Sequence, residues 1–320
     1  MRRAATWLLC LSALAIGCAA ERGPGDLLAP GQLGIIVVES QLLVGEPLPR
    51  IRVHLTQSPT EPYNQSRAGL AGATVVVATS AGRTIRYAGD PASPGIYLPE
   101  GHDAGAAPIV DPRTTYALRV IAPDGRVVTA ETTTPDRLDI REWVLLDAST
   151  LAPLRRLATR EDFTVDPDSV YAADANQLVY QEGLLEARFD RGSAVAFQIG
   201  ILSRDAGSPY VVDADFLSDV DLARLERETA SPPFDGAEGF VRLPWYAIFF
   251  EGRYDIAIYS VDRNWFDLAR SIQILGNANI AFGSNAGDDF ERPIFHVKGG
   301  IGLFGSAARD GVGFTVHPRP

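Results

Sequence analysis

The chain has 320 residues, of which 46% are hydrophobic, and it carries a formal net charge of −11 at pH 7. A nucleic-acid-binding function is not expected, because phosphates require a basic protein surface, and docking onto anionic lipids through charge is disfavoured for the same reason. The 30 glycines and 22 prolines separate short apolar runs, which is typical of an all-β protein.

The first twenty residues have the features of a cleavable export signal. Arg2 and Arg3 precede an apolar run, Ala4–Ile16, that is too short to span a bilayer. A small residue then precedes Cys18, which is the pattern cut by a lipoprotein signal peptidase. The thiol of Cys18 would carry a diacylglycerol, and several acyl chains together make a stable anchor where one chain binds only marginally. We therefore predict a lipoprotein signal peptide at residues 1–18, lipidated at Cys18.

An ordinary secretory signal cut near Ala20, with Cys18 discarded, is the alternative. Ala19, and not Asp, follows the cysteine, so the predicted destination is the outer membrane and not the inner one. The body of the protein could face either the periplasm or the cell exterior. Cys10 is the only other cysteine and lies within the signal, so the mature chain is predicted to contain neither a disulfide nor a thiolate metal site.

The first part of the mature chain reads as a tether followed by short strands. Residues 19–32 have the glycine, proline and charge content of a flexible linker. In residues 33–135, apolar side chains alternate along Ile51–Thr56, and hairpin turns are predicted at Ser80–Gly82 and Pro123–Gly125. About seven short strands in about 100 residues predict a β-sandwich of the immunoglobulin or transthyretin type.

Residues 136–320 are predicted to form a second β-rich domain with two short helices, since about 300 mature residues suggest two domains. Leu184–Phe189 and Ala194–Leu202 are expected to be a pair of strands joined by a turn. The predicted helices are Ser218–Glu228, in which the first residue can act as N-cap, and Trp265–Ile274.

The tail Phe295–Val316 is predicted to form a strand, a glycine turn and another strand. A phosphate-binding loop needs a Lys and then a Ser or Thr directly after its last glycine, whereas a β-like tail follows the segment Gly299–Gly305. The glycines are therefore predicted to permit positive φ or close backbone packing. By contrast, residues 148–175 mix charged and small side chains, and no element is predicted there.

Motifs along the whole mature chain resemble one family of bacterial proteins. The motifs of the first domain are Val37–Ser40, Val53–Thr56, Ala71–Val75, Pro94–Tyr97, Tyr116–Val120 and the Asp124-Gly125 turn. Those of the second are Tyr259–Val261, the aromatic pair Trp265-Phe266 and Val297–Gly305. Together they resemble the uncharacterised lipoprotein family called domain of unknown function 4249, and the Gly-Gly-Ile-Gly-Leu-Phe-Gly stretch is the most specific of them.

This resemblance implies an outer-membrane lipoprotein of a kind often encoded beside TonB-dependent receptors, and it supplies no catalytic residues. The chain departs from the family pattern at two places. Residues 148–180 match none of its motifs, and Arg113-Thr114-Thr115 stands where the pattern has a glycine turn before Tyr116.

An acidic run is the strongest metal candidate in the sequence, because calcium prefers several carboxylates on a short loop. Its members are Asp213, Asp215, Asp219 and Asp221. The spacing is not that of an EF-hand, and acids also favour a helix start, so the helix interpretation is preferred. The four histidines lack zinc-ligand spacing; they are His54, His102, His296 and His317.

The aromatic segment Leu243–Phe250 is a candidate ligand or partner site through Trp245, Tyr246 and Phe249. Core packing is the alternative, and it is favoured.

No nucleophile, metal cluster or cofactor loop stands out from these patterns, so we predict a non-enzymatic accessory protein without a cofactor. It would bind a partner or ligand at an outer-membrane transporter, with a TonB-dependent receptor as the candidate partner. Two alternatives stay open. One is a cell-envelope hydrolase with Asp and His side chains dispersed in sequence, and the other is a calcium-stabilised surface adhesion protein built on the acidic run.

Overall fold

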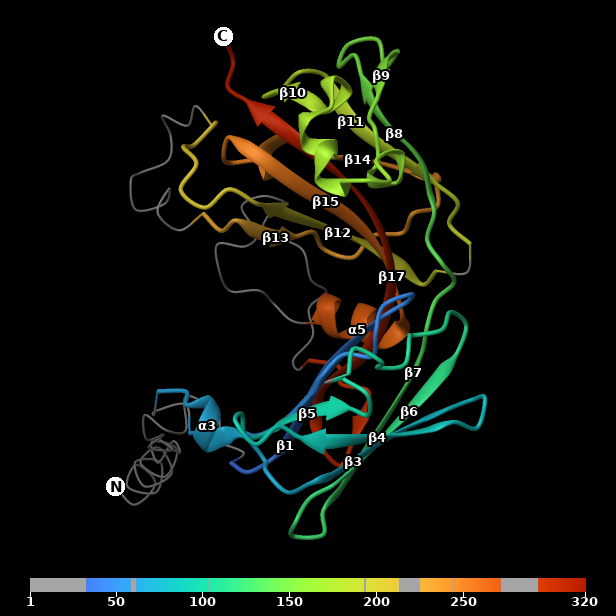
Figure 1. Cartoon of the computed structure of the whole chain (residues 1–320), viewed down its shortest axis with the longest axis vertical. Coiled ribbons are helices and arrows are strands. Elements are labelled where there is room, and N and C mark those ends of the chain that lie inside the picture. The colour runs from blue at the N-terminus through green and yellow to red at the C-terminus, as the bar shows by residue number, and fades with distance from the viewer. Residues whose placement is uncertain are drawn as a thin grey trace, which may run out of the picture.

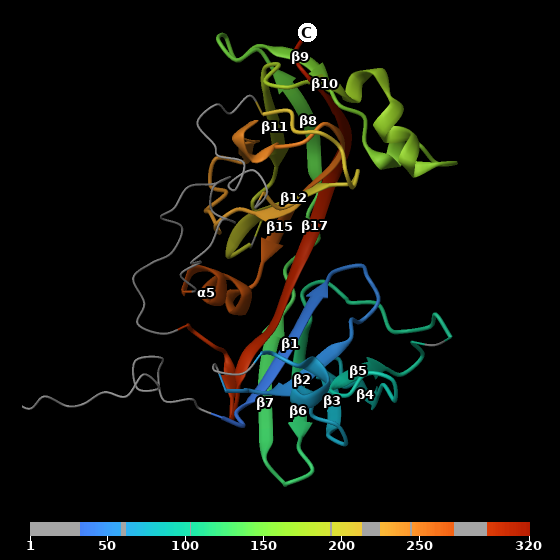
Figure 2. The ribbon, with the colours of Figure 1, turned by 90° about the vertical axis from the view of Figure 1, so that its left-hand side faces the viewer.

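A computed structural model describes residues 33–58, 62–102, 104–192, 194–212, 225–243, 245–271 and 293–320. Strands dominate this part of the chain and form two halves that follow one another along the long axis of the molecule (Figure 1). A single long strand, β17 (Ile301–His317), runs through both halves (Figure 2). The prediction of a mainly β chain is confirmed.

The first half contains seven antiparallel strands and one short helix, α3 (Gln65–Ala68). In chain order the strands are β1 (Ile36–Leu43), β2 (Ile51–Leu55), β3 (Thr74–Thr79), β4 (Thr84–Gly89), β5 (Ile96–Pro99), β6 (Thr115–Ile121) and β7 (Val127–Thr133). Their order in space is β1-β2-β5-β4-β3-β6-β7. The predicted hairpins at Ser80–Gly82 and Pro123–Gly125 are both present, with Gly82 and Gly125 at positive φ.

The tail of the chain completes this half. The two-residue strand β16 (Val297–Lys298) pairs with β7, and after a bend at Gly299-Gly300 strand β17 pairs in parallel with β1. Strands therefore surround one core, and alternate residues point into it. The core includes Ile36, Val38, Val53, Val77, Val120 and Phe304.

The second half is a sandwich of two sheets. The strands are β8 (Ile140–Leu146), β9 (Pro153–Arg156), β10 (Gln177–Val179), β11 (Leu184–Phe189), β12 (Ala196–Ser203), β13 (Glu228–Ala230), β14 (Phe240–Leu243) and β15 (Gly252–Val261). One sheet has the order β14-β11-β8-β9, and the other continues from β17 through β15 and β12 to β13, with β10 also paired to β17. The core between them includes Trp143, Phe189, Phe197, Ile258 and Phe314.

The prediction that Leu184–Phe189 and Ala194–Leu202 pair with each other is wrong, although both segments are strands. β11 pairs with β8 and β14, whereas β12 pairs with β13 and β15 in the opposite sheet. The physical reason is that each strand buries an aromatic side chain in the same core. The rings of Phe189 and Phe197 meet there with centroids 4.7 Å apart.

One predicted helix is confirmed and the end of the other is wrong. α5 (Arg263–Ser271) begins two residues before the predicted Trp265. The predicted helix Ser218–Glu228 falls mostly outside the described residues, but residues 225–227 are not helical and β13 begins at Glu228. Pairing with β12 decides the structure there. No helix among the described residues has the length and apolar character of a membrane span.

The predicted strand, glycine turn and strand of the tail are confirmed. Gly299 and Gly302 have φ of 79° and 116°, and a Cβ on Gly302 would lie 2.1 Å from the carbonyl oxygen of Val38. These glycines therefore allow both positive φ and the close approach of β17 to β1. At Ala307, strand β17 changes its neighbour from β1 to β15, and residues 307–316 pair with β15.

Polar contacts join the two halves beside α5. Asp262 is 5% exposed and precedes the helix, and its Oδ1 accepts a hydrogen bond from the backbone N–H of Trp265 at 2.9 Å. The hydroxyl of Thr132 in β7 donates to the other oxygen of Asp262 and lies 2.7 Å from the hydroxyl of Ser306 in β17. Asp262 thus links the end of β15 to strands of the first half.

Candidate functional site

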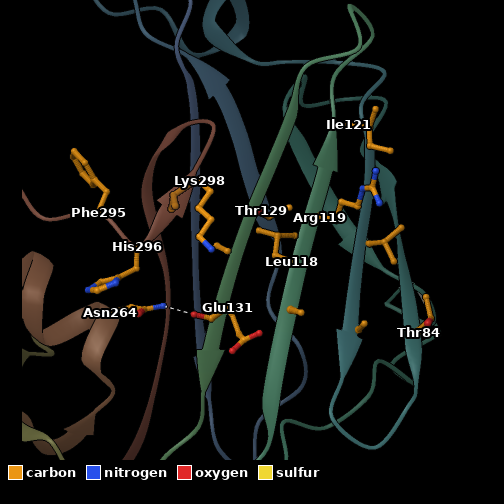
Figure 3. Close-up of a pocket in the computed structure, with 15 residues that line it drawn as sticks. Thr84, Leu118, Arg119, Ile121, Thr129, Glu131, Asn264, Phe295, His296 and Lys298 are labelled. Carbon is orange, nitrogen blue, oxygen red and sulfur yellow. Dashed lines mark hydrogen bonds between the residues drawn. The ribbon is translucent and has the colours of Figure 1, made fainter.

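A groove of about 870 Å³ lies on the outer face of the first half, over β3, β6 and β7 (Figure 3). Alternation places Val75 and Val77 in the core, so their neighbours Val76 and Ala78 point outward into the groove. Ala78 pairs with Ala117 of β6. Because these side chains are small, the surface is hollow there.

The wall of the groove is formed by the segment Phe295–Lys298 and by α5 (Figure 3). From α5, the side-chain amide of Asn264 donates to the carbonyl oxygens of Glu131 at 2.6 Å and Phe304 at 2.8 Å. These bonds fasten the helix to β7 and β17, so the wall and the floor of the groove belong to one hydrogen-bonded unit.

His296 is attached to the same helix. Its Nε2 lies 2.8 Å from Oδ2 of Asp267, a side chain that also accepts from Arg263 and Arg270. Burial alone would raise the pKa of Asp267, but the hydrogen bond from His296 and the two guanidinium groups lower it below its ordinary value. Asp267 is therefore an ionised anchor, and the imidazole of His296 is tied to α5.

The charged side chains that line the groove are mostly cationic. Arg119 and Lys298, the only lysine of the chain, face it together with the carboxylate of Glu131. Thr84, Thr129 and Asn264 add neutral polar groups. An apolar floor with a few polar groups around it is the usual composition of a ligand site.

Comparison with known families gives one match. The family model described as Domain of unknown function (DUF4249) matches residues 29–312, which is most of the chain and includes the groove and most of β17. The chain belongs to this family. The family resemblance read from the motifs is thereby confirmed. No curated protein matches the DUF4249 chain.

Most sequence-predicted site residues of this DUF4249 protein do not lie at the groove. Cys18 and the four aspartates Asp213, Asp215, Asp219 and Asp221 fall outside the described residues. Within the described ranges, no group of three or more His, Cys, Asp or Glu side chains is placed to hold a metal ion. Of the four histidines, His296 is the one that lines the groove.

The aromatic candidates lie in the second half of the DUF4249 chain. Phe249 is 6% exposed and packs in the core of the sandwich. Trp245 is half-buried, contacts Tyr180 edge to face and donates its indole N–H to the carbonyl of Gly183 at 2.7 Å. Tyr246 lies in the short 3-10 turn Trp245–Ala247, and its side chain is not described. Phe249 is therefore unavailable to a ligand, and Trp245 has a packing role.

Sequence reasoning missed the groove because its residues come from separate strands. Val76, Ala117 and Thr129 stand on β3, β6 and β7 and are unremarkable in sequence. The signal that could have revealed the groove is the small size of the side chains that point outward on adjacent strands, where large polar side chains are usual. Lys298 carried a further signal as the only lysine.

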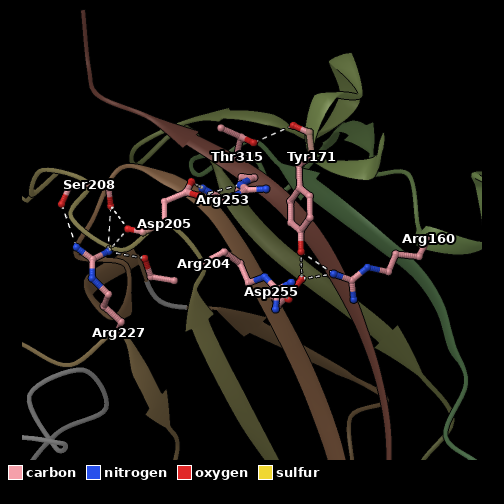
Figure 4. Close-up of polar contacts among 10 residues, drawn as sticks. Arg160, Tyr171, Arg204, Asp205, Ser208, Arg227, Arg253, Asp255 and Thr315 are labelled. Carbon is pink, nitrogen blue, oxygen red and sulfur yellow. Dashed lines mark hydrogen bonds and ion pairs between the residues drawn. The ribbon is translucent and has the colours of Figure 1, made fainter. Parts of the chain in front are cut away.

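A second polar cluster lies on the other half, outside β15 (Figure 4). The hydroxyl of Tyr171 donates to Asp255 at 2.6 Å, and Arg160 bonds both groups. Burial and Asp255 raise the pKa of Tyr171 to about 12. Arg253 pairs with Asp205 at 2.6 Å. These arginines are matched by acids, so the cluster serves to hold the segment that contains Tyr171 against the sheet.

Proposed function

We propose that this DUF4249 protein is a lipid-anchored, non-enzymatic accessory protein that binds a partner at an outer-membrane transporter. The partner we infer is a TonB-dependent receptor, as the family resemblance implies. The observation that carries the proposal is the groove over β3, β6 and β7, which combines an apolar floor with cationic and neutral polar side chains. A site of this composition on a rigid sheet suits recognition of a partner segment.

The attachment of the groove wall supports a binding role. Asn264 holds α5 to the carbonyls of Glu131 and Phe304, and His296 is held by Asp267. A site that is already ordered loses little conformational entropy when a partner binds. The anchor would be the lipid on Cys18. The tether of residues 19–32 follows this cysteine, and the two together would keep the body of the protein near other envelope proteins.

Replacing Cys18 by serine is expected to abolish lipidation, because serine has no thiol to form the thioether. The measurement is incorporation of radiolabelled palmitate together with fractionation of the cell envelope. The Cys18→Ser protein should carry no label and should remain as an unprocessed precursor or appear in a soluble fraction. A Cys10→Ser variant is the matched control and should be labelled normally. Equal labelling of the Cys18→Ser variant and the natural protein would contradict the lipid anchor.

Filling the groove is expected to remove partner binding. Ala117 is half-buried in the floor, so an Ala117→Trp side chain would occupy the hollow. The tagged protein is purified from mildly solubilised outer membranes at native expression, and co-purifying envelope proteins are identified. Recovery of a receptor should fall at least about fivefold, which corresponds to about 1 kcal/mol.

The control is Ala81→Trp, which places the same side chain on the exposed β3–β4 turn. Recovery of the receptor should be unchanged in this variant. If no receptor or other envelope protein is recovered with the natural protein, the proposed function fails.

A further inference from the structure

Strand register aligns cations in one row across the outer face of the first half. Arg86 of β4 pairs with Val76 of β3, and Val76 pairs with Arg119 of β6. Arg119 then pairs with Thr129 of β7, which pairs with Lys298 of β16. Residues directly opposite one another on neighbouring strands point to the same face. Arg86, Arg119 and Lys298, here called the cationic row, therefore occupy every second strand of this face.

The cationic row is exposed and its charges are not compensated by ion pairs within the described part of the chain. Elsewhere exposed arginines such as Arg126 and Arg253 form short ion pairs with acids. The neighbouring acids on this face are Glu131, beside Arg119 and Lys298, and Glu100, whose N–H bonds the carbonyl of Arg86. The row thus keeps a positive excess although the whole chain carries −11.

We propose that the cationic row and the adjoining groove bind an extended acidic peptide segment of a partner protein. This inference rests on the proposed function and gives the chemistry by which the partner would be recognised. Neighbouring strands lie about 4.8 Å apart, so successive cations of the row are separated by about 10 Å and the whole row spans about 19 Å. A chain in the extended polyproline II conformation advances about 3.1 Å per residue with three residues per turn, so every third side chain points the same way at intervals of about 9 Å.

The spacing therefore predicts a segment of about seven residues with an acidic side chain at every third position. Each acid would meet one cation of the row, and the residues between them would contact the apolar floor formed by Val76, Ala78 and Ala117. Charge alone would attract many anions, but the equal intervals of the row favour a ligand whose charges are equally spaced.

The test measures fluorescence anisotropy of labelled peptides with the full chain in mild detergent. The probe is Glu-Val-Thr-Glu-Val-Thr-Glu. Two controls are Gln-Val-Thr-Gln-Val-Thr-Gln, which has no acids, and Glu-Glu-Glu-Val-Thr-Val-Thr, which has the same composition with the acids clustered. The spaced acidic peptide should bind at least about tenfold more tightly than either control. Its affinity should fall as salt rises from 0.05 to about 0.5 M, because exposed charges are screened.

Arg119→Gln and Lys298→Gln are each expected to weaken binding of the probe about fivefold, and the double variant about twentyfold. Arg156→Gln is the matched control, since Arg156 is an exposed arginine on β9 of the other half. Circular dichroism should show that the two single variants, the double variant and the Arg156→Gln control all keep the fold of the natural protein.

Equal binding of the spaced and clustered peptides, or unchanged affinity in the double variant, would overturn the proposal. Displacement of the probe by dextran sulfate at equal charge concentration would overturn it also, because the row would then be a general polyanion surface. The chain has acids of its own at Asp288, Asp289 and Glu291. If replacing them by Asn, Asn and Gln raises the affinity for the probe, this acidic stretch is the natural occupant of the cationic row, and the proposal is overturned. If the natural protein binds the probe but recovers no receptor, the recognition chemistry stands and the proposed function fails.

Discussion

Replacing Gly302 by alanine is expected to lower the free energy of unfolding by about 3 kcal/mol or more. Two effects act together. Gly302 has a φ of 116°, which an L-residue adopts only with strain, and a Cβ there would lie 2.1 Å from the carbonyl oxygen of Val38. Positive φ costs about 1–2 kcal/mol, and forcing atoms into a filled space costs about 1–3 kcal/mol more. The measurement is denaturation by urea followed by circular dichroism.

Gly125→Ala provides the control for the backbone effect alone. Gly125 also has a positive φ, of 87°, but no atom lies within 4 Å of its would-be Cβ. This variant should lose only about 1–2 kcal/mol. If the two variants lose the same stability, the close approach of β17 to β1 does not contribute to the cost.

Replacing Asp262 by alanine is expected to cost about 2–4 kcal/mol. The change removes the acceptor of the Trp265 N–H at the start of α5 and the acceptor of the Thr132 hydroxyl. Loss of an N-cap costs about 1 kcal/mol, and a buried group left without its partner costs about 1–3 kcal/mol. Asp262→Asn keeps an oxygen for the N–H and should cost less than about 1 kcal/mol. Urea denaturation of both variants at pH 7 gives the comparison.

The same pair of variants predicts a pH dependence. Burial raises the pKa of the Asp262 carboxyl above 3.8, and hydrogen bonds from Thr132 and the α5 backbone only partly offset this. The ionised form is therefore less favourable in the folded than in the unfolded chain. Stability from this group is present below pH 3.8 and is lost as pH rises through the folded pKa. The Asp262→Asn variant should gain stability relative to the natural protein over that rise; a constant difference would contradict the raised pKa.

Local patterns were sufficient to predict most strands and turns. Along Ile51–Leu55 the alternation of apolar residues matches the buried side chains, and Gly82 and Gly125 occupy the positive-φ positions of their hairpins. Arg113 is instructive because it has a φ of 50° at the place where the family pattern has a glycine turn. The backbone turn is therefore present even though the residue type that favours it is absent.

Pairing between distant segments was not predictable from local patterns. The turn between Phe189 and Ala196 resembles a hairpin, yet burial of aromatic rings from both strands places them in opposite sheets. Residues 148–175 gave no pattern because polar contacts specify their structure. The side chain of Asn176, which is completely buried, bonds the backbone of Ala158 and the carbonyl of Gly313. Such contacts have no periodic signature in the sequence.

The candidate site was less predictable than the fold for the same reason. Arg119 and Lys298 are 179 residues apart in the chain, and each looks like an ordinary exposed residue of its own strand. Only the register of β6, β7 and β16 brings them into one row. The conspicuous aromatic run at Leu243–Phe250 contributes instead to the core of the second half through Phe249 and Phe250.

The position of β17 has a consequence for the order in which the protein can be assembled. Every strand that pairs with β17 is synthesised before it, including β1 at the start of the fold and β15 about 40 residues earlier. Until residues 301–317 emerge, β1 lacks one of its two neighbours and the sheet of the second half lacks the strand between β15 and β10. Neither half can therefore complete its native hydrogen bonding before these residues have been made. A ribosome that stops before residue 301 would leave two incomplete sheets with exposed edges.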